Sequence, residues 1–358
     1  MTISRRSFLR GSLGVVGACL TPALLLSQSL AFADCRRQKK LVVIHLTGGN
    51  DGLNTVVPYG VGAYYDARPG LAIKQSHVLP LSDSLGLHPQ MAGLHELFKQ
   101  GDVGIIQSVG YPDQNRSHFR SSDIWQSAYT DRLSETGWLG RYVDGCMAKG
   151  EENLAACNID SELPLSLRAT RFSAASWQDG AISGAAGAIA IGSGNHFGYP
   201  ADRLGRKLRT IAKLIRSNNS AQIYTTSLDG FDTHANQIIV QAPLLAHLSE
   251  ALTAFHADLR TDGKMDDVLV LVFSEFGRRV PENGGGGTDH GSAQPVFIIG
   301  GSVNGGIYGE HACLTDLQAG DLRSSIDFRT VYATILDRWL SADSSQILGR
   351  NFGHVDFV

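Results

Sequence analysis

The chain has 358 residues, with 31 basic and 34 acidic side chains and a formal net charge of −3. Only 18% of its residues are charged, so it lacks the basic face that electrostatic binding to nucleic acid requires, and we expect no nucleic-acid partner. Hydrophobic residues make up 43% of the chain, which excludes intrinsic disorder and is enough for a large core.

The first 33 residues are typical of a twin-arginine export signal. Arg5 and Arg6 precede an apolar stretch that ends in Ala31-Phe32-Ala33, a pattern that signal peptidases cleave. Polar residues and Pro22 interrupt the apolar stretch, so it is a poor membrane-spanning helix. We expect cleavage after Ala33, with a lipidated Cys19 as the alternative. The twin-arginine translocase is then the export partner, the location is periplasmic or extracellular, and the mature chain has no stable membrane span.

Residues 34–358 are expected to form a single domain with a net charge of −6, since the signal carries three arginines and no acid. Four cysteines remain without a C-x-x-C pair, so the spacing excludes a thioredoxin-like motif or a zinc ribbon. Cys146 and Cys157 can pair across a short loop in an oxidising compartment, or each can be a buried free thiol.

Short apolar segments alternate with segments of helical periodicity along this domain. The expected strands are 41–46, 103–109, 223–228, 268–273 and 296–299, and the expected helices are 89–99, 119–129, 201–216, 244–260 and 328–340. This alternation predicts an α/β fold in which helices cover both faces of a mostly parallel sheet. The Ala/Gly/Ser-rich stretch Gly180–Gly194 is expected to be an insertion or a lid.

Side chains that can bind a metal follow three of the expected strands and precede a fourth. Taken alone, each has an ordinary explanation as a turn, a helix cap or a surface ion pair. Together they predict a divalent metal site, because ligands collect at the carboxyl ends of parallel strands. The candidate ligands are Asp51, Asp232, His234, Glu275 and His290.

The best candidate nucleophile is Ser117, in the segment Asn115–Phe119 after the second expected strand. No G-x-S-x-G, P-loop or G-x-G-x-x-G motif occurs, which disfavours a serine-hydrolase elbow and leaves nucleotide binding without a motif. A helix that begins near residue 118 would offer free backbone N–H groups to an anion. Ser117 can equally be the N-cap of that helix.

These segments resemble the DUF1501 family of exported bacterial proteins. The resemblance rests on 48–54, 117–119, 230–234, 274–278, 287–291 and 327–332. That family is grouped with the alkaline phosphatase and sulfatase superfamily, which implies a three-layer α/β/α sandwich with a mostly parallel, mixed sheet. It also implies one or two divalent metal ions, which can be zinc, calcium, manganese or magnesium.

The resemblance implies a role for each candidate residue. Asp232, His234 and His290 would bind one metal, Asp51 and Glu275 a second, and Ser117 would be the nucleophile between them. Arg278, or else Arg116 or Arg279, would clamp the anionic substrate. The expected function is therefore hydrolysis of phosphate, sulfate or related esters. The alternative is an inactive exported binding or assembly protein of the same fold, with a small anionic ester or a polysaccharide as its ligand.

Overall fold

The computed structural model describes residues 39–148, 156–178, 181–183, 197–217, 221–311 and 313–358. The predicted export signal lies outside these residues, and so does most of the predicted lid at 180–194. Only the short strand β8 (Ala181–Ser183) of that stretch is described.

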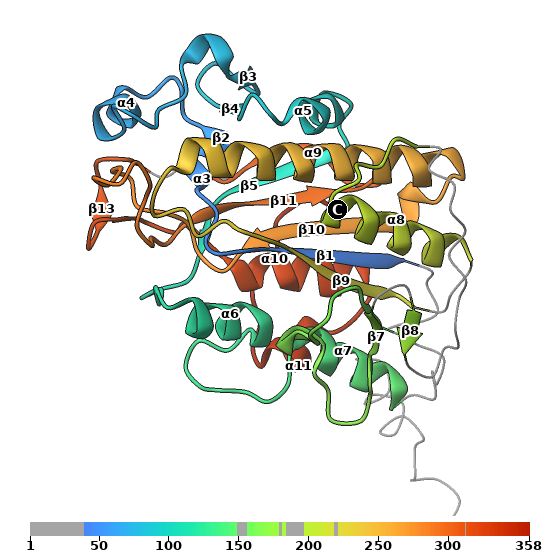
Figure 1. The fold of residues 1–358 in the computed structure, drawn as a ribbon. Coiled ribbons are helices and arrows are strands. Elements are labelled where there is room, and N and C mark those ends of the chain that lie inside the picture. The colour runs from blue at the N-terminus through green and yellow to red at the C-terminus, as the bar shows by residue number, and fades with distance from the viewer. Residues whose placement is uncertain (1–38, 149–155, 179–180, 184–196, 218–220, 312) are drawn as a thin grey trace, which may run out of the picture.

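One mixed sheet of ten strands forms the centre of the molecule (Figure 1). Its order is β12-β5-β11-β10-β1-β9-β6-β7-β8, and β15 also pairs with β5. The pairs β10–β11, β11–β5 and β7–β8 are antiparallel, whereas the others are parallel. The other strands of this sheet are β1 (Lys40–Thr47), β5 (Val103–Gly110), β6 (Ala156–Asn158), β7 (Ala175–Gln178), β9 (Ile223–Asp229), β10 (Val268–Ser274), β11 (Gln294–Ile299), β12 (Gly306–Tyr308) and β15 (Ile326–Asp327).

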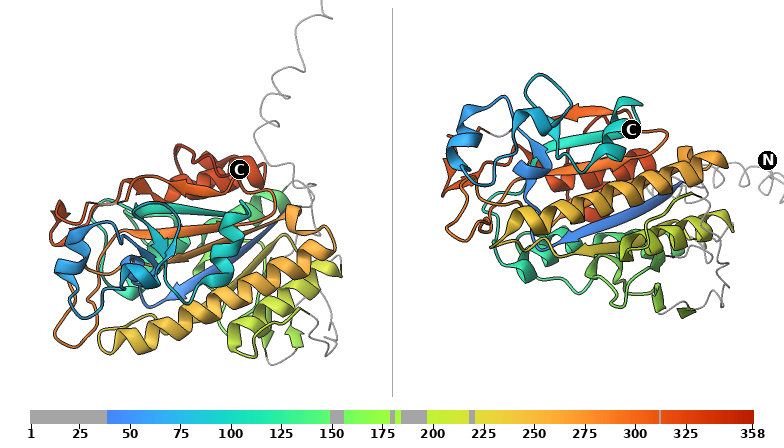
Figure 2. Two further views of the ribbon diagram at one scale, coloured as in Figure 1. Left: turned by 90° about the horizontal axis from the view of Figure 1, so that it is seen from above. Right: turned by 45° about the horizontal axis from the view of Figure 1, so that its top comes forward.

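Helices cover both faces of this sheet, as the two further views also show (Figure 2). The layer on one face consists of α5 (Ala92–Lys99), α8 (Arg203–Arg216) and α9 (Gln237–Thr261). The layer on the other consists of α6 (His118–Ser127), α7 (Trp138–Met147), α10 (Phe328–Thr334) with the π-helical turn η4 (Ile335–Trp339), and α11 (Ser344–Leu348). The predicted three-layer α/β/α fold with a mostly parallel, mixed sheet is confirmed.

Smaller elements surround one edge of the sheet or connect the main ones. A three-stranded sheet of β2 (Val56–Val57), β3 (Leu79–Pro80) and β4 (Gly86–Leu87) lies near α3 (Gly52–Thr55) and α4 (Gly62–Ala67). The hairpin of β13 (Leu317–Gln318) and β14 (Asp321–Leu322) is separate. The short helical turns are η1 (Gln75–His77), η2 (Leu165–Leu167) and η3 (Met265–Asp267).

The central strand β1 explains why the sheet has two cores. Val42, Ile44 and Leu46 point into the core under α5, α8 and α9, whereas Leu41 and Val43 point into the core under α6, α7 and α10. Because successive side chains of a strand face opposite sides, a strand covered on both faces must be apolar nearly throughout. The continuous apolar run that predicted this strand follows from that burial.

Helix α9 begins at Gln237, seven residues before the predicted start, and includes Pro243 in its second turn. It is long and apolar enough to cross a membrane by length and composition. In the structure, however, it lies along the sheet and buries Leu245, Leu252 and Phe255 in the core, as core helices of soluble proteins do.

The suggested pairing of Cys146 with Cys157 is wrong. Cys157 is a free thiol in β6, whereas Cys146 in α7 is disulfide-bonded elsewhere. Burial raises the pKa of the Cys157 thiol to about 11, so it is protonated and unreactive at neutral pH.

Candidate metal site

The loops that carry the candidate residues meet at one edge of the sheet. Strands β1, β9 and β10 are parallel and end there at Thr47, Asp229 and Ser274. Strand β11 is antiparallel to β10 and therefore begins at the same edge. Strand β5 is antiparallel to β11 and ends there, before the segment that leads to α6. The structure therefore gathers these loops at a single edge, as the strand order requires.

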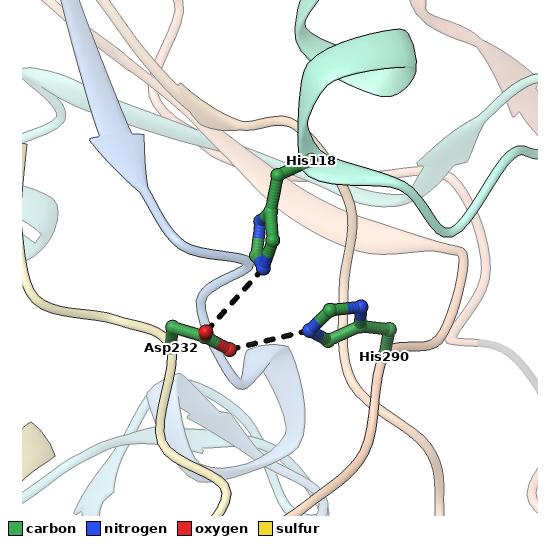
Figure 3. Close-up of side chains that lie close together, drawn as sticks. All are labelled: His118, Asp232 and His290. Carbon is green, nitrogen blue, oxygen red and sulfur yellow. Dashed lines mark hydrogen bonds and ion pairs between the residues drawn. The ribbon is translucent and has the colours of Figure 1, made fainter.

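Three of these loops bring His118, Asp232 and His290 together (Figure 3). One ligand atom from each residue lies within 4.8 Å of the other two. His290 Nε2 is 3.2 Å from Asp232 Oδ1, and His118 Nε2 is 3.5 Å from Asp232 Oδ2. His118 Nε2 is buried and has no hydrogen-bond partner. A buried nitrogen that faces a carboxylate and a second imidazole without a bonded partner fits a metal ligand.

Glu275 lies behind His118 and not in the cluster. Its Oε1 accepts hydrogen bonds from His118 Nδ1 at 2.7 Å and from the Gly48 amide at 2.9 Å. Its Oε2 is 3.1 Å from Nε2 of His45, a residue of β1. Although burial favours the neutral acid, the hydrogen bonds from His118 and His45 hold the pKa of Glu275 well below its ordinary value.

This carboxylate fixes the orientation of the His118 ring. Nδ1 donates a proton to Glu275, so Nε2 points toward Asp232. The hydrogen bond to Glu275 also raises the pKa of His118. Metal-binding histidines commonly have such a carboxylate behind them. The structure therefore places Glu275 as the hydrogen-bond partner of His118, outside the cluster of three donor atoms, in contrast to the expectation that it binds the metal itself.

His290 is oriented in a similar way by the backbone. Its Nδ1 donates to the carbonyl of Arg116 at 2.8 Å, which leaves Nε2 directed at Asp232. Burial is the main cause that lowers the pKa of His290, and the neutral imidazole is the form that binds metals. His234 lies beside this group, with Nδ1 2.9 Å from Asp232 Oδ1 and its ring 4.7 Å from that of His290.

Arg278 is buried and holds the loops of the site together. Its guanidinium donates to the carbonyls of Gly48, Gly49, Phe231 and Thr288, and its Nη2 is 2.7 Å from Asp232 Oδ1. Burial raises the pKa of Asp232, but the hydrogen bond from Arg278 and the positive charge of its guanidinium act in the opposite direction, and the pKa is lowered overall. With its donors occupied and its side chain out of solvent, Arg278 is not the anion clamp that the resemblance implied.

Asp51 reaches the same edge but is committed to a buried ion pair. Arg68 Nη2 donates to its Oδ1 at 3.0 Å, and Arg68 Nη1 contacts Oδ2. The same carboxylate caps α3 by accepting from the Leu53 amide, and Gln237 donates to it as well. The structure therefore does not bring Asp51 into the metal cluster, because a buried guanidinium already neutralises it.

Ser117 occupies the N-cap position of α6, directly before His118. Its side chain makes no capping hydrogen bond, and the residue is exposed. Ser121, one turn further on, is buried and donates to the Glu275 carbonyl at 2.6 Å. Ser117 is thus placed beside the cluster without the structural bond that would explain it as a cap.

Sequence reasoning did not assign His118 and His45 to the site. His118 belongs to the segment 117–119 that carried the family resemblance, so its presence beside the candidate nucleophile was an available signal. His45 interrupts an otherwise apolar strand, and its ring stacks on Phe273 at 4.9 Å between centroids. A polar residue in a strand covered on both faces requires a partner, which is Glu275 here.

The comparisons with known proteins agree with the sequence prediction of the family. The model of the DUF1501 family, described as a protein of unknown function, matches residues 201–354 of the chain. The matched part contains Asp232, His234, Glu275, Arg278 and His290. Comparison with curated proteins finds no match.

Similar solved structures have low sequence identity to this chain. A protein in the alkaline phosphatase superfamily from Vibrio parahaemolyticus is 10% identical, with TM-score 0.44, over 89% of this chain and 71% of its own. The C-terminal periplasmic domain of EptC from Escherichia coli, in complex with zinc, is 8% identical, with TM-score 0.38, over 76% and 77%. The lipoteichoic acid synthase LtaP from Listeria monocytogenes is 11% identical, with TM-score 0.42, over 82% and 75%.

Proposed function

We propose that this chain is an exported hydrolase of phosphate, sulfate or related esters that holds one divalent metal ion with His118, Asp232 and His290. The observation that supports this most is the convergence of three donor atoms from three separate loops within 4.8 Å. One of them, His118 Nε2, is buried without a hydrogen-bond partner. The export part of the proposal rests on residues 1–33, which lie outside the described structure.

The donor set favours zinc over magnesium and calcium. Two imidazoles and one carboxylate are a ligand set of catalytic zinc, which leaves a further position open, whereas magnesium and calcium prefer oxygen ligands. A second ion at Asp51 and Glu275 is not part of the proposal, because both carboxylates are engaged by other side chains. When bound, the ion would supply Lewis-acid stabilisation of negative charge on the ester oxygens.

Ser117 would act as the nucleophile, and His234 would act as the general acid and base. The Oγ of Ser117 attacks the phosphorus or sulfur of the ester and gives its proton to solvent. As that bond forms, the bond to the alcohol oxygen breaks, and this oxygen takes a proton from protonated His234. Water then attacks the phosphorus or sulfur of the Ser117 ester and gives one proton to His234, while its oxygen stays on the released anion. The bond to Ser117 Oγ breaks, and Oγ takes back a proton from solvent. His234 suits this role because its side chain is 46% exposed while Nδ1 stays against Asp232.

Metal content and turnover, measured together, test the proposal. The chain is purified after native export without chelators, its bound metals are quantified, and turnover of aryl phosphates and sulfates is assayed. We expect His290→Ala to lose both metal and turnover. His77→Ala is the matched control, because His77 is exposed and far from the cluster in the chain. A wild-type chain without stoichiometric metal and without turnover would contradict the proposal and favour the binding-protein alternative.

A further inference from the structure

A cavity of about 220 Å³ lies beside the candidate metal site. The segment between β5 and α6 forms one wall, and the β13–β14 hairpin forms another. Arg116 connects the cavity to the site: its carbonyl accepts from His290 Nδ1, while its guanidinium Nε donates to Asp321 Oδ2 at 2.7 Å. We call this space the Arg116 cavity. A ligand in this cavity is therefore separated from the cluster by residue Arg116.

Two wall residues of the Arg116 cavity carry buried acceptors without donors. Gln114 Oε1 and Asp321 Oδ1 have no hydrogen-bond partner, although Gln114 is anchored through Nε2 to the Glu275 carbonyl at 3.3 Å. Asp321 is only 5% exposed. Arg279 Nε is 3.7 Å from its Oδ1, too far for a hydrogen bond. Buried acceptors are normally paired, so two unpaired ones in one cavity wall favour a ligand that brings donors.

The charges around the cavity favour an uncharged donor. Arg116 lies against one oxygen of Asp321 and Arg279 approaches the other, so two guanidinium groups offset this carboxylate. Asp113 at the exposed rim adds a second carboxylate, so two acidic and two basic side chains balance around the cavity. Hydroxyl groups donate without adding charge, and each can also accept from Arg116 or from Gln318 at the exposed rim.

We propose that the Arg116 cavity binds an uncharged polyhydroxylated group, a sugar or polyol, belonging to the alcohol part of the ester. This assignment rests on the proposed function for its role in catalysis, but the cavity and its unpaired acceptors do not depend on a metal. The substrate class would then be phosphate or sulfate esters of sugars or polyols, with the ester group at the cluster and the hydroxyls in the cavity.

Binding of a neutral sugar to metal-stripped protein tests the assignment separately from catalysis. The probe is methyl α-glucopyranoside, observed by saturation-transfer NMR in the presence of EDTA, with cyclohexanol as a ring of similar size that lacks the set of hydroxyls. Ser324 lines the cavity, so Ser324→Leu fills it, whereas Ser324→Ala does not. Gln318→Leu at the rim is a second blocking variant that does not depend on packing in the wall.

We expect saturation transfer to the glucoside from the wild type and from Ser324→Ala, and its loss in Ser324→Leu and Gln318→Leu. Absence of transfer from the wild type would overturn the assignment. Equal transfer from all variants, or equal transfer to cyclohexanol, would overturn it as well. Because neither metal nor turnover enters the measurement, a failure of the hydrolase proposal would leave this result intact, and the reverse also holds.

Discussion

Removal of the Asp51 carboxylate should destabilise the fold and leave the metal site intact. The side chains of Asp51 and Arg68 are both fully buried, and the pair also caps α3 and contacts Asn54. Asp51→Ala leaves the Arg68 guanidinium buried without its counter-ion. Breaking a buried pair from one side costs about 3–5 kcal/mol, a large part of the stability of an ordinary domain.

Urea unfolding with and without EDTA separates this role from metal binding. If the Asp51–Arg68 pair has a structural role, Asp51→Ala should lower the free energy of unfolding by about 3–5 kcal/mol under both conditions. His290→Ala, in contrast, should lower it only when metal is present, because a ligand that binds the folded state stabilises it by mass action. Asp83→Ala, at an exposed position, is the matched control and should stay within about 0.5 kcal/mol. An effect of Asp51→Ala that disappears in EDTA, together with loss of metal, would refute the reasoning and restore Asp51 as a ligand.

Three further predictions concern single residues. Glu275→Gln should weaken metal affinity about 10–100-fold, since it removes the charged partner of the His118 ring. A competition titration with a chelator measures this affinity. Unchanged affinity would contradict the role of Glu275 in orienting His118. Ser117→Ala should abolish turnover while the metal content stays the same. The free energy of unfolding should change by less than about 0.5 kcal/mol, because the side chain makes no capping hydrogen bond. Full turnover of this variant would exclude Ser117 as the nucleophile. Burial lowers the pKa of His88 from 6.5 to about 4, so the unfolded chain takes up a proton that the folded chain does not as pH falls through this range. His88 should therefore lower the free energy of unfolding by about 3 kcal/mol between pH 7 and 4. Urea unfolding of His88→Gln should show a smaller decrease in the free energy of unfolding over this pH range than the wild type.

The sequence predicted the sheet because its strands are buried on both faces. A strand such as β1 must be apolar at successive positions when two helical layers cover it, so the pattern is visible without knowledge of its partners. Strands β6, β7 and β8 were not predicted, since three or four residues carry too little pattern. Helix α9 was predicted to begin only after Pro243, although the chain tolerates this proline within the helix.

The candidate site was predicted as a set of loops, but not as a set of ligands. The order of parallel strands brings Asp232, Glu275 and His290 to one edge, which sequence reasoning can infer. The choice between ligand and partner depends on contacts between distant residues. Glu275 meets His118 across 157 positions of the chain, and Arg68 reaches Asp51 from a separate segment after α4. Residue type alone does not distinguish a carboxylate that is free to bind metal from one that a buried cation already neutralises.

The position of a bound metal ion tests the central claim most directly. Crystals of the natively exported protein, measured on both sides of the zinc absorption edge, give an anomalous difference map that locates zinc without reference to turnover. We predict one peak at about 2.0–2.2 Å from His118 Nε2, His290 Nε2 and a carboxylate oxygen of Asp232. A peak coordinated by Asp51 or Glu275, or a fully occupied site elsewhere with none between these three residues, would contradict the account.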